Sequence, residues 1–308
     1  GQTALWLDPD EMRLIIVSGL SGSGKSVALR LLEDLDFYCV DNIPVRLLRA
    51  FVTEMANRDD YTFENIGIGL DVRSQHSDMA EIPELLKDLE HSGTQIETIF
   101  LQADNSVILK RFRETRRKHP LTDQNTSLEE AIAKERELLR PVFNSAELII
   151  NTSNTNIYEL REQIRDRVAQ RENTTVSIQI ESFGYKHGLP DNADFVFDVR
   201  CLPNPYWHSE LQMLNGRDQA VIDFLAAQPL VQEMIDDITD FLKAWIPRYE
   251  NFQRAYLTIA IGCTGGQHRS VYIAEAVAQR LATDHGGIRV RHNELPQSES
   301  NGDQQQAD

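Results

Sequence analysis

Residues 19–26 read GLSGSGKS and match the phosphate-loop pattern G-x-x-x-x-G-K-[ST]. In such a loop, backbone amides at the start of a helix surround the α- and β-phosphates of a nucleotide. Lys25 is predicted to reach the β- and γ-phosphates, and Ser26 to ligate magnesium. The pattern predicts that the following residues bind nucleotide: Gly19, Leu20, Ser21, Gly22, Ser23, Gly24, Lys25 and Ser26.

A second group of candidates follows the apolar run IGIGL, at Asp71, Val72, Arg73 and Ser74. Asp71 ends that run, where a carboxylate can support magnesium across the sheet from the phosphate loop. Lys25, Ser26 and Asp71 are therefore the predicted catalytic groups. An ordinary polar strand end is an equally good interpretation of Asp71. Asp41 has the same two interpretations, as a group that orients water or an acceptor and as a turn cap.

The segment KRFRETRRKH (110–119) has six Lys or Arg residues within nine positions. Arg113, Arg116 and Arg117 are candidates to clamp a γ-phosphate or another anion. A solvated helix face is the alternative, since charge runs usually have that explanation.

A second anion-binding pattern occurs at GCTGGQHRS (262–270), after the apolar run YLTIAI. Its C-x-x-G-x-x-R-S spacing is that of cysteine-dependent phosphatases, with Cys263 as a thiolate nucleophile and Arg269 as the phosphate ligand. Gly262 replaces the histidine that usually precedes such a cysteine, and no leaving-group acid is identifiable. A binding site for a phosphorylated metabolite or a phosphate backbone is therefore favoured, and a buried structural loop is the third interpretation. The predicted site comprises Lys186, His187, Cys263, Thr264, Gly265, Gly266, Gln267, His268, Arg269 and Ser270.

The elements that position these motifs alternate along the chain. Apolar strands are expected at 14–19, 37–42, 65–72, 98–103 and 147–152, with amphipathic helices between them. This order predicts an α/β fold: an N-terminal P-loop NTPase (kinase-like) domain with a parallel sheet. A smaller C-terminal α/β domain is predicted from strands at 176–184, 194–200 and 256–262 and helices at 217–246 and 270–282. A helix from about 155 to 170 and a polar linker, AQRENTT (169–175), are expected between the two domains. The predicted segments are a flexible N-terminus (1–12), the two domains (13–172 and 173–293) and a disordered acidic tail (294–308).

Composition narrows the function. The chain has 308 residues and a net charge of −17, which disfavours non-specific binding of nucleic acid or membranes by the chain as a whole. No apolar stretch is long enough to span a membrane. Three widely spaced cysteines argue against a disulfide framework or zinc site and for a cytoplasmic location.

Several longer motifs together resemble one family, the bacterial RNase adapter RapZ and its P-loop nucleotide-binding relatives. They are GLSGSGKSVALRLLEDLDFYCVDNIP, DVR (71–73), TRRKHPL, ESFGYKHGLP, DVRCLPNPYW and GCTGGQHRSVYIAE. The resemblance covers residues 13–292 and implies binding and weak hydrolysis of ATP and GTP, with Mg²⁺, at residues 19–26 and 71–74. It also implies a homo-oligomer that binds small regulatory RNA, presents it to an endoribonuclease and senses glucosamine-6-phosphate through its C-terminal domain.

Four residues match the sensing loop of the family: Thr264, Gly265, His268 and Arg269. The sequence departs from the enterobacterial members in its tail, NELPQSESNGDQQQAD, which contains no Lys or Arg where they carry a basic RNA-binding tail. Tyr206 also replaces a histidine of those members. Because the tail has no Lys or Arg, it lacks the positive charges that would contact RNA phosphates.

Two anion loops on separate domains favour a regulator with two inputs over a transferase. A small-molecule kinase, a cysteine phosphatase in the C-terminal domain and a pure RNA-binding adaptor are the alternative hypotheses.

Overall fold

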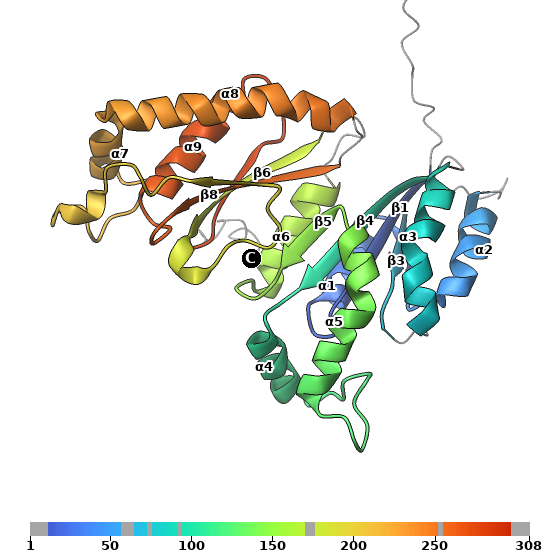
Figure 1. Cartoon of the computed structure of the whole chain (residues 1–308). Helices are drawn as coiled ribbons and strands as arrows, with labels where there is room; N and C mark the ends of the chain where they lie inside the picture. Colours follow the sequence, from blue (N-terminus) through green and yellow to red (C-terminus); the bar gives the residue numbers. More distant parts are fainter. Residues whose placement is uncertain are drawn as a thin grey trace, which may run out of the picture. The chain divides into compact units, whose positions relative to one another are not determined.

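The computed structural model of the chain describes residues 12–56, 65–72, 76–91, 94–169, 176–251 and 255–296. Contacts divide the chain into two compact units, residues 1–171 and 172–308, each built on its own sheet (Figure 1). Arg73 and Ser74, all but the first residue of the predicted linker at 169–175, and most of the two predicted flexible ends lie outside the described residues. No helix among the described residues is long and apolar enough to cross a membrane.

The first unit has a five-stranded parallel sheet in the order β2-β3-β1-β4-β5. Its strands are β1 (Arg13–Gly19), β2 (Tyr38–Asp41), β3 (Asn65–Gly69), β4 (Gln95–Gln102) and β5 (Leu148–Asn151). Every residue of the central β1 is buried, which explains the unbroken apolar run LIIV.

Helices cover both faces of this sheet. On one face α3 (His76–His91) packs between α2 (Val45–Ala56) and α5 (Leu128–Ser145), and α4 (Asn105–Thr115) packs on α5 (Figure 1). On the other face α1 (Lys25–Asp34) packs against α6 (Ile157–Ile164). Because the strands are parallel, the loops that follow β1, β2 and β3 meet at one edge of the sheet.

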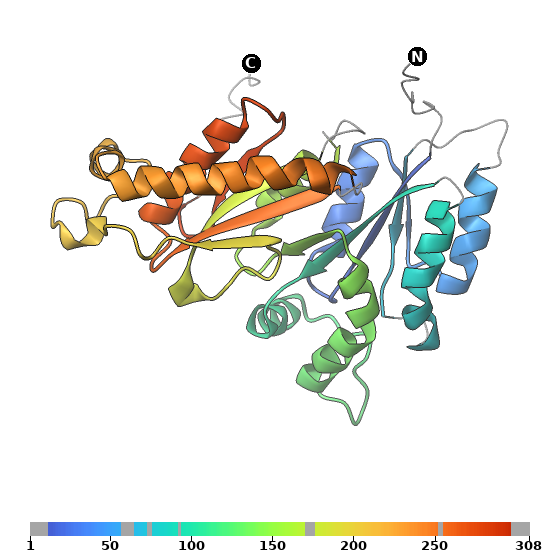
Figure 2. The same cartoon turned by 45° about the horizontal axis from the view of Figure 1, so that its top comes forward.

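The second unit has a four-stranded parallel sheet in the order β7-β8-β6-β9. Its strands are β6 (Ser177–Gly184), β7 (Phe195–Asp198), β8 (Tyr256–Cys263) and β9 (Arg289–His292). The helices α7 (Gln219–Ala226), α8 (Pro229–Asn251) and α9 (Arg269–Leu281) share one core with the sheet, and Figure 2 shows the long α8 running along it. Short 3-10 turns follow β6 (Tyr185–His187) and β7 (Pro205–Trp207).

The structure confirms the predicted fold class, two α/β units with parallel sheets, and corrects three details. The helix expected over 217–246 is two helices, and Pro229 begins the second, a position that proline favours. The helix expected after residue 155 changes to π-helical geometry at Arg165–Ala169. The strand β9 was not predicted, because the charged sequence RVRH has no apolar run.

Candidate functional site

The phosphate loop connects β1 to α1 and needs glycine at its two ends. Gly19 has φ +138° and Gly24 has φ +113°, values that other residues rarely adopt. A Cβ atom on Gly19 would lie 2.0 Å from the Leu101 carbonyl oxygen, and one on Gly24 would lie 2.7 Å from Leu160 Cδ2. The motif glycines therefore allow the loop to turn sharply against β4 and α6.

The loop's charged and polar groups face one edge of the sheet. Lys25 Nζ donates a hydrogen bond to the Gly19 carbonyl at 2.7 Å, so the ammonium group lies across the loop. Ser26 lies in the first turn of α1 and is exposed. Asp71 is buried and follows β3, and continuing the Val17–Gly69 register by two residues places it opposite Gly19. The sheet thus brings the three predicted catalytic residues to the same edge.

The other motif residues differ in whether they are buried in the fold or exposed at the edge of the sheet. The Leu20 side chain is buried in the core, and its amide donates to the Leu101 carbonyl at 3.0 Å. The amide of Ser23 donates to the Leu20 carbonyl at 3.0 Å, and its side chain is buried. Gly22 is exposed, and Val72 is buried. Asp41 ends β2 with its carboxylate over Gly69, at the same edge of the sheet.

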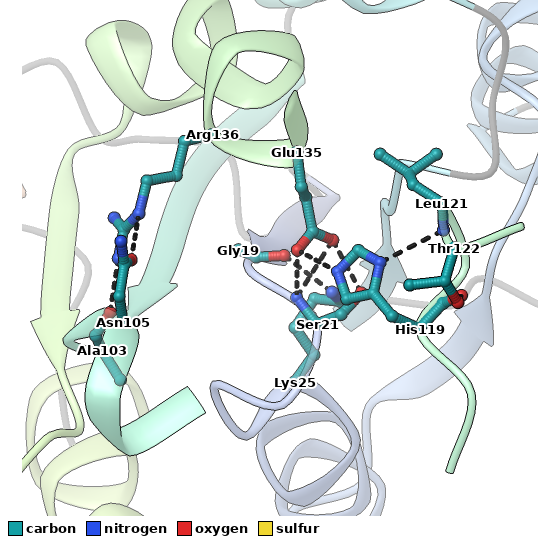
Figure 3. Close-up of polar contacts among 10 residues, drawn as sticks. All are labelled: Gly19, Ser21, Lys25, Ala103, Asn105, His119, Leu121, Thr122, Glu135 and Arg136. Carbon is teal, nitrogen blue, oxygen red and sulfur yellow. Dashed lines mark hydrogen bonds and ion pairs between the residues drawn. The ribbon is translucent and has the colours of Figure 1, made fainter. Parts of the chain in front are cut away.

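A buried carboxylate outside every motif holds this loop (Figure 3). Both oxygens of Glu135 accept from the Ser21 amide at 3.0 Å, and Oε1 also accepts from the Ser21 hydroxyl at 2.6 Å. His119 Nε2 lies 3.0 Å from Glu135 Oε2. Burial alone would raise the pKa of Glu135, but hydrogen bonds from His119 and Ser21 and the charge of Lys25 hold that pKa below its ordinary value.

The helix that carries Glu135 is fixed at both its start and its middle. The sequence SLEE forms a capping box: the Ser127 hydroxyl accepts from the Glu130 amide, and the Glu130 carboxylate accepts from the Ser127 amide. Next to Glu135, Arg136 donates to the Ala103 carbonyl at 2.6 Å and to Asn105 Oδ1 at 3.0 Å (Figure 3). These contacts set the position of α5 against the end of β4.

Within the basic segment, one arginine reaches the phosphate loop. Arg111 Nη1 donates to the Gly22 carbonyl at 3.0 Å, and its Nη2 donates to the Thr152 carbonyl at 2.6 Å. The Thr152 hydroxyl in turn donates to the Ser23 carbonyl at 2.9 Å. Arg111, Thr152 and Glu135 were not among the predicted site residues. The predicted clamp residues Arg113, Arg116 and Arg117 are exposed.

In the second unit, the loop after β8 surrounds a cysteine sulfur with donors. Cys263 is 3 % exposed, and its Sγ accepts from the Gly266 amide at 3.3 Å and lies 3.2 Å from Ser270 Oγ. Burial raises the pKa of this thiol, but the contacts with Ser270 and Gly266 and the nearby charge of Arg269 lower it by more, so the net pKa is below the ordinary 9.0. These contacts stabilise the ionised form of the Cys263 thiol relative to that of an ordinary cysteine.

The arginine of this loop, Arg269, connects it to the loop that follows β7. Arg269 is buried and its Nη1 donates to the carbonyls of Arg200 and Leu202, at 2.8 and 3.0 Å, in the loop after β7. His268 is also buried and lies 3.1 Å from the Leu211 carbonyl through Nε2, so its imidazole packs inside the fold. The side chains of Arg269 and His268 therefore stabilise the loop through contacts with backbone carbonyls.

The remaining predicted residues form the rim at the same edge. The Lys186 amide donates to the Thr264 carbonyl at 3.2 Å, and the Lys186 and Thr264 side chains are exposed. His187 Nε2 lies 3.2 Å from a Glu294 carboxylate oxygen. Gly265 and Gln267 belong to the same loop, and the Gln267 side chain is exposed.

The whole described chain matches a single family. Residues 12–172 match the RapZ-like N-terminal domain and residues 176–296 match the RapZ C-terminal domain. The chain is 47% identical over 293 residues to a nucleotide-binding protein of Marinobacter nauticus. The aligned residues make up 95% of this chain and all of the relative. The chain is 49% identical to a nucleotide-binding protein of Cellvibrio japonicus, over 92% of this chain and 95% of that one. The chain therefore belongs to the RapZ-like family, as its motifs predicted.

Solved structures resemble part of the chain. An unliganded sugar kinase from Janibacter aligns with 50% of this chain and 92% of its own length, at 16% identity and a TM-score of 0.34. A shikimate kinase from Bacteroides thetaiotaomicron aligns with 50% of this chain and 96% of its own, at 17% identity and a TM-score of 0.30. The fold class itself rests on the strand orders given above.

Proposed function

We propose that this chain is a regulatory protein that binds ATP or GTP with Mg²⁺ in its first unit and hydrolyses it slowly. The observation that carries the proposal is the phosphate loop, in which Lys25 lies across the turn at Gly19 and α1 begins directly after it. A helix N-terminus with an ammonium group beside it attracts phosphate. The M. nauticus and C. japonicus relatives are nucleotide-binding proteins, which supports nucleotide as the ligand.

Magnesium can bind at this site with few protein ligands. No group of three or more His, Cys, Asp or Glu side chains suited to a metal occurs among the described residues. Mg²⁺ bound with a nucleotide usually keeps several waters and takes few protein ligands beside phosphate oxygens. Ser26 would supply the hydroxyl and Asp71 a carboxylate that positions a water. When bound, the ion would neutralise charge that develops on the phosphates.

The test is an equilibrium titration of the full chain with fluorescent ATP and GTP analogues, with and without Mg²⁺. Lys25→Ala should abolish measurable binding, because it removes the positive charge at the loop. Lys110→Ala is the matched control, since Lys110 is exposed and pairs only weakly, at 3.9 Å, with Glu114. Unchanged affinity and turnover in Lys25→Ala would refute the assignment.

For the second unit we propose a phosphate-bearing ligand at residues 263–270, with Lys186 and His187 on the rim. The family resemblance suggests glucosamine-6-phosphate as the small molecule, small regulatory RNA and an endoribonuclease as partners, and a homo-oligomer. Titration with the sugar phosphate and with small RNA at two salt concentrations separates these ligands. RNA bound through its backbone should lose affinity steeply as salt rises, whereas a single phosphate group should lose little.

A second candidate function for the same loop is phosphate-ester hydrolysis, which the contacts around Cys263 Sγ favour. The thiolate would attack phosphorus and the ester P–O bond would break. The leaving alcohol would take up a proton, and water would then cleave the S–P bond. Cys263→Ser should abolish hydrolysis of p-nitrophenyl phosphate, with the exposed Cys201→Ser as the control. A wild-type protein that releases no phosphate excludes this function.

A further inference from the structure

Ser21, in the phosphate loop, is held by a carboxylate 114 residues away along the chain. Glu135 accepts three hydrogen bonds from the amide and hydroxyl of Ser21, and its side chain has no exposed surface. A carboxylate removed from water is strongly destabilising unless donors replace its hydration. The conformation at Ser21 and the charge of Glu135 therefore depend on each other.

The second partner of Glu135 is a histidine whose tautomer the contacts define. The Leu121 amide donates to His119 Nδ1 at 3.1 Å, so Nδ1 carries no proton (Figure 3). The ring proton is then on Nε2, which points at Glu135 Oε2 from 3.0 Å. His119 is therefore a neutral donor to an ionised carboxylate, and neither side chain is exposed.

His119 is the last residue of the basic segment 110–119. Its ring lies against Phe112 of α4, with centroids 5.2 Å apart, and a Cβ atom on Gly22 would lie 3.3 Å from that same phenyl ring. The Thr122 hydroxyl donates to the His119 carbonyl at 2.8 Å. One buried cluster thus contacts the phosphate loop and contains Phe112 and His119, the residues that flank the arginine-rich segment 113–117.

We propose that Glu135 is a positioning residue of the nucleotide site and that, through neutral His119, it couples the shape of the phosphate loop to the placement of segment 113–117. In this role Glu135 touches no phosphate. It fixes Ser21, so that the amides from Gly22 to Ser26 keep their curvature. The inference rests on the proposed nucleotide site. Removing either partner should therefore weaken nucleotide binding by the folded protein.

The first test compares Glu135→Gln with Glu137→Gln, a matched control two residues along the same helix. Glu137 is exposed and pairs only with exposed Arg140. Fluorescent ATP titration of the full chain should give a dissociation constant raised about tenfold or more in Glu135→Gln, as for losing a hydrogen bond to a charged group, and within about twofold in the control. Thermal unfolding without nucleotide reports whether each variant folds.

The second test uses variants of His119, so its result does not depend on whether Glu135→Gln folds. His119→Gln retains an N–H donor toward Glu135, whereas His119→Leu removes it. The titratable groups that act on Glu135 are His119 and, through its charge, Lys25. In His119→Leu the carboxylate should take up a proton at a higher pH, so nucleotide affinity should begin to fall at a higher pH than in wild type. His119→Gln should restore the wild-type pH profile.

The outcomes separate the two ideas. If wild type and Glu137→Gln bind nucleotide and folded Glu135→Gln binds equally well, the positioning role is wrong and the proposed function stands. If His119→Leu only lowers the melting temperature, with affinity and pH profile unchanged, the cluster is merely structural and the coupling is wrong. If wild type binds no nucleotide while folded, the proposed function fails and the inference fails with it.

Discussion

Substitution of Gly19 by alanine tests the close approach between the phosphate loop and β4. The new Cβ would lie 2.0 Å from the Leu101 carbonyl oxygen, a backbone atom that cannot rotate away. The alanine would also have to adopt φ +138°, a conformation that costs about 1–3 kcal/mol for a residue other than glycine. Relief of the clash would separate the loop from β4 and break the hydrogen bond from the Leu20 amide to the Leu101 carbonyl, which contributes about 1 kcal/mol.

The sum is a loss of about 3 kcal/mol, a large part of the roughly 5–15 kcal/mol that holds a domain together. Urea unfolding of the full chain, followed by circular dichroism, measures it. Gly265→Ala is the matched control, because a Cβ atom there would meet nothing within 4 Å and its φ is not positive. A shift below about 1 kcal/mol for Gly19→Ala, or an equal shift for both variants, would refute the reasoning.

Three further predictions follow from charges and contacts around the two loops. Arg111→Ala should weaken nucleotide binding about tenfold by removing its bond to Gly22, whereas Lys110→Ala should not; equal affinities by titration would contradict this. Cys263 should ionise below pH 9.0, so thiolate absorbance near 240 nm should rise at lower pH in wild type than in Cys263→Ser. Coincident titration curves for the two proteins would exclude a lowered pKa of Cys263. Because the folded-state pKa of Glu135 is lowered, its contribution to stability is present above its ordinary pKa and lost as pH falls through the folded value. Acid unfolding should therefore depend less on pH in Glu135→Gln, and an unchanged slope would argue against an ionised carboxylate.

Local patterns were enough to predict the phosphate loop and the strand that precedes it. The apolar run before Gly19 and the glycine spacing after it act within a few residues, so the sequence alone carries them. The two parallel sheets were predictable for the same reason, from apolar runs separated by amphipathic helices. Lys25, Ser26 and Asp71 meet at one edge because parallel strands end on the same side.

The contacts made by Glu135 could not be predicted, because they depend on tertiary structure. Glu135 lies on a helix whose sequence is rich in acidic residues, and only packing distinguishes it from its exposed neighbour Glu137. Arg111 is one of six clustered basic residues, and the turn of α4 determines which of them reaches Gly22. In β6, the polar side chains of Gln179 and Glu181 are buried, although polar residues that alternate with apolar ones are typical of a strand with one face in water.

The most direct measurement of the central claim is an amide chemical-shift titration of the isotope-labelled full chain with Mg²⁺–ATP. The largest shifts should occur at the amides of residues 22–26, at the start of α1, while residues 264–268 of the second loop should respond to a sugar phosphate instead. Saturable shifts confined to residues 264–268 on addition of nucleotide, with residues 22–26 unmoved, would contradict that claim.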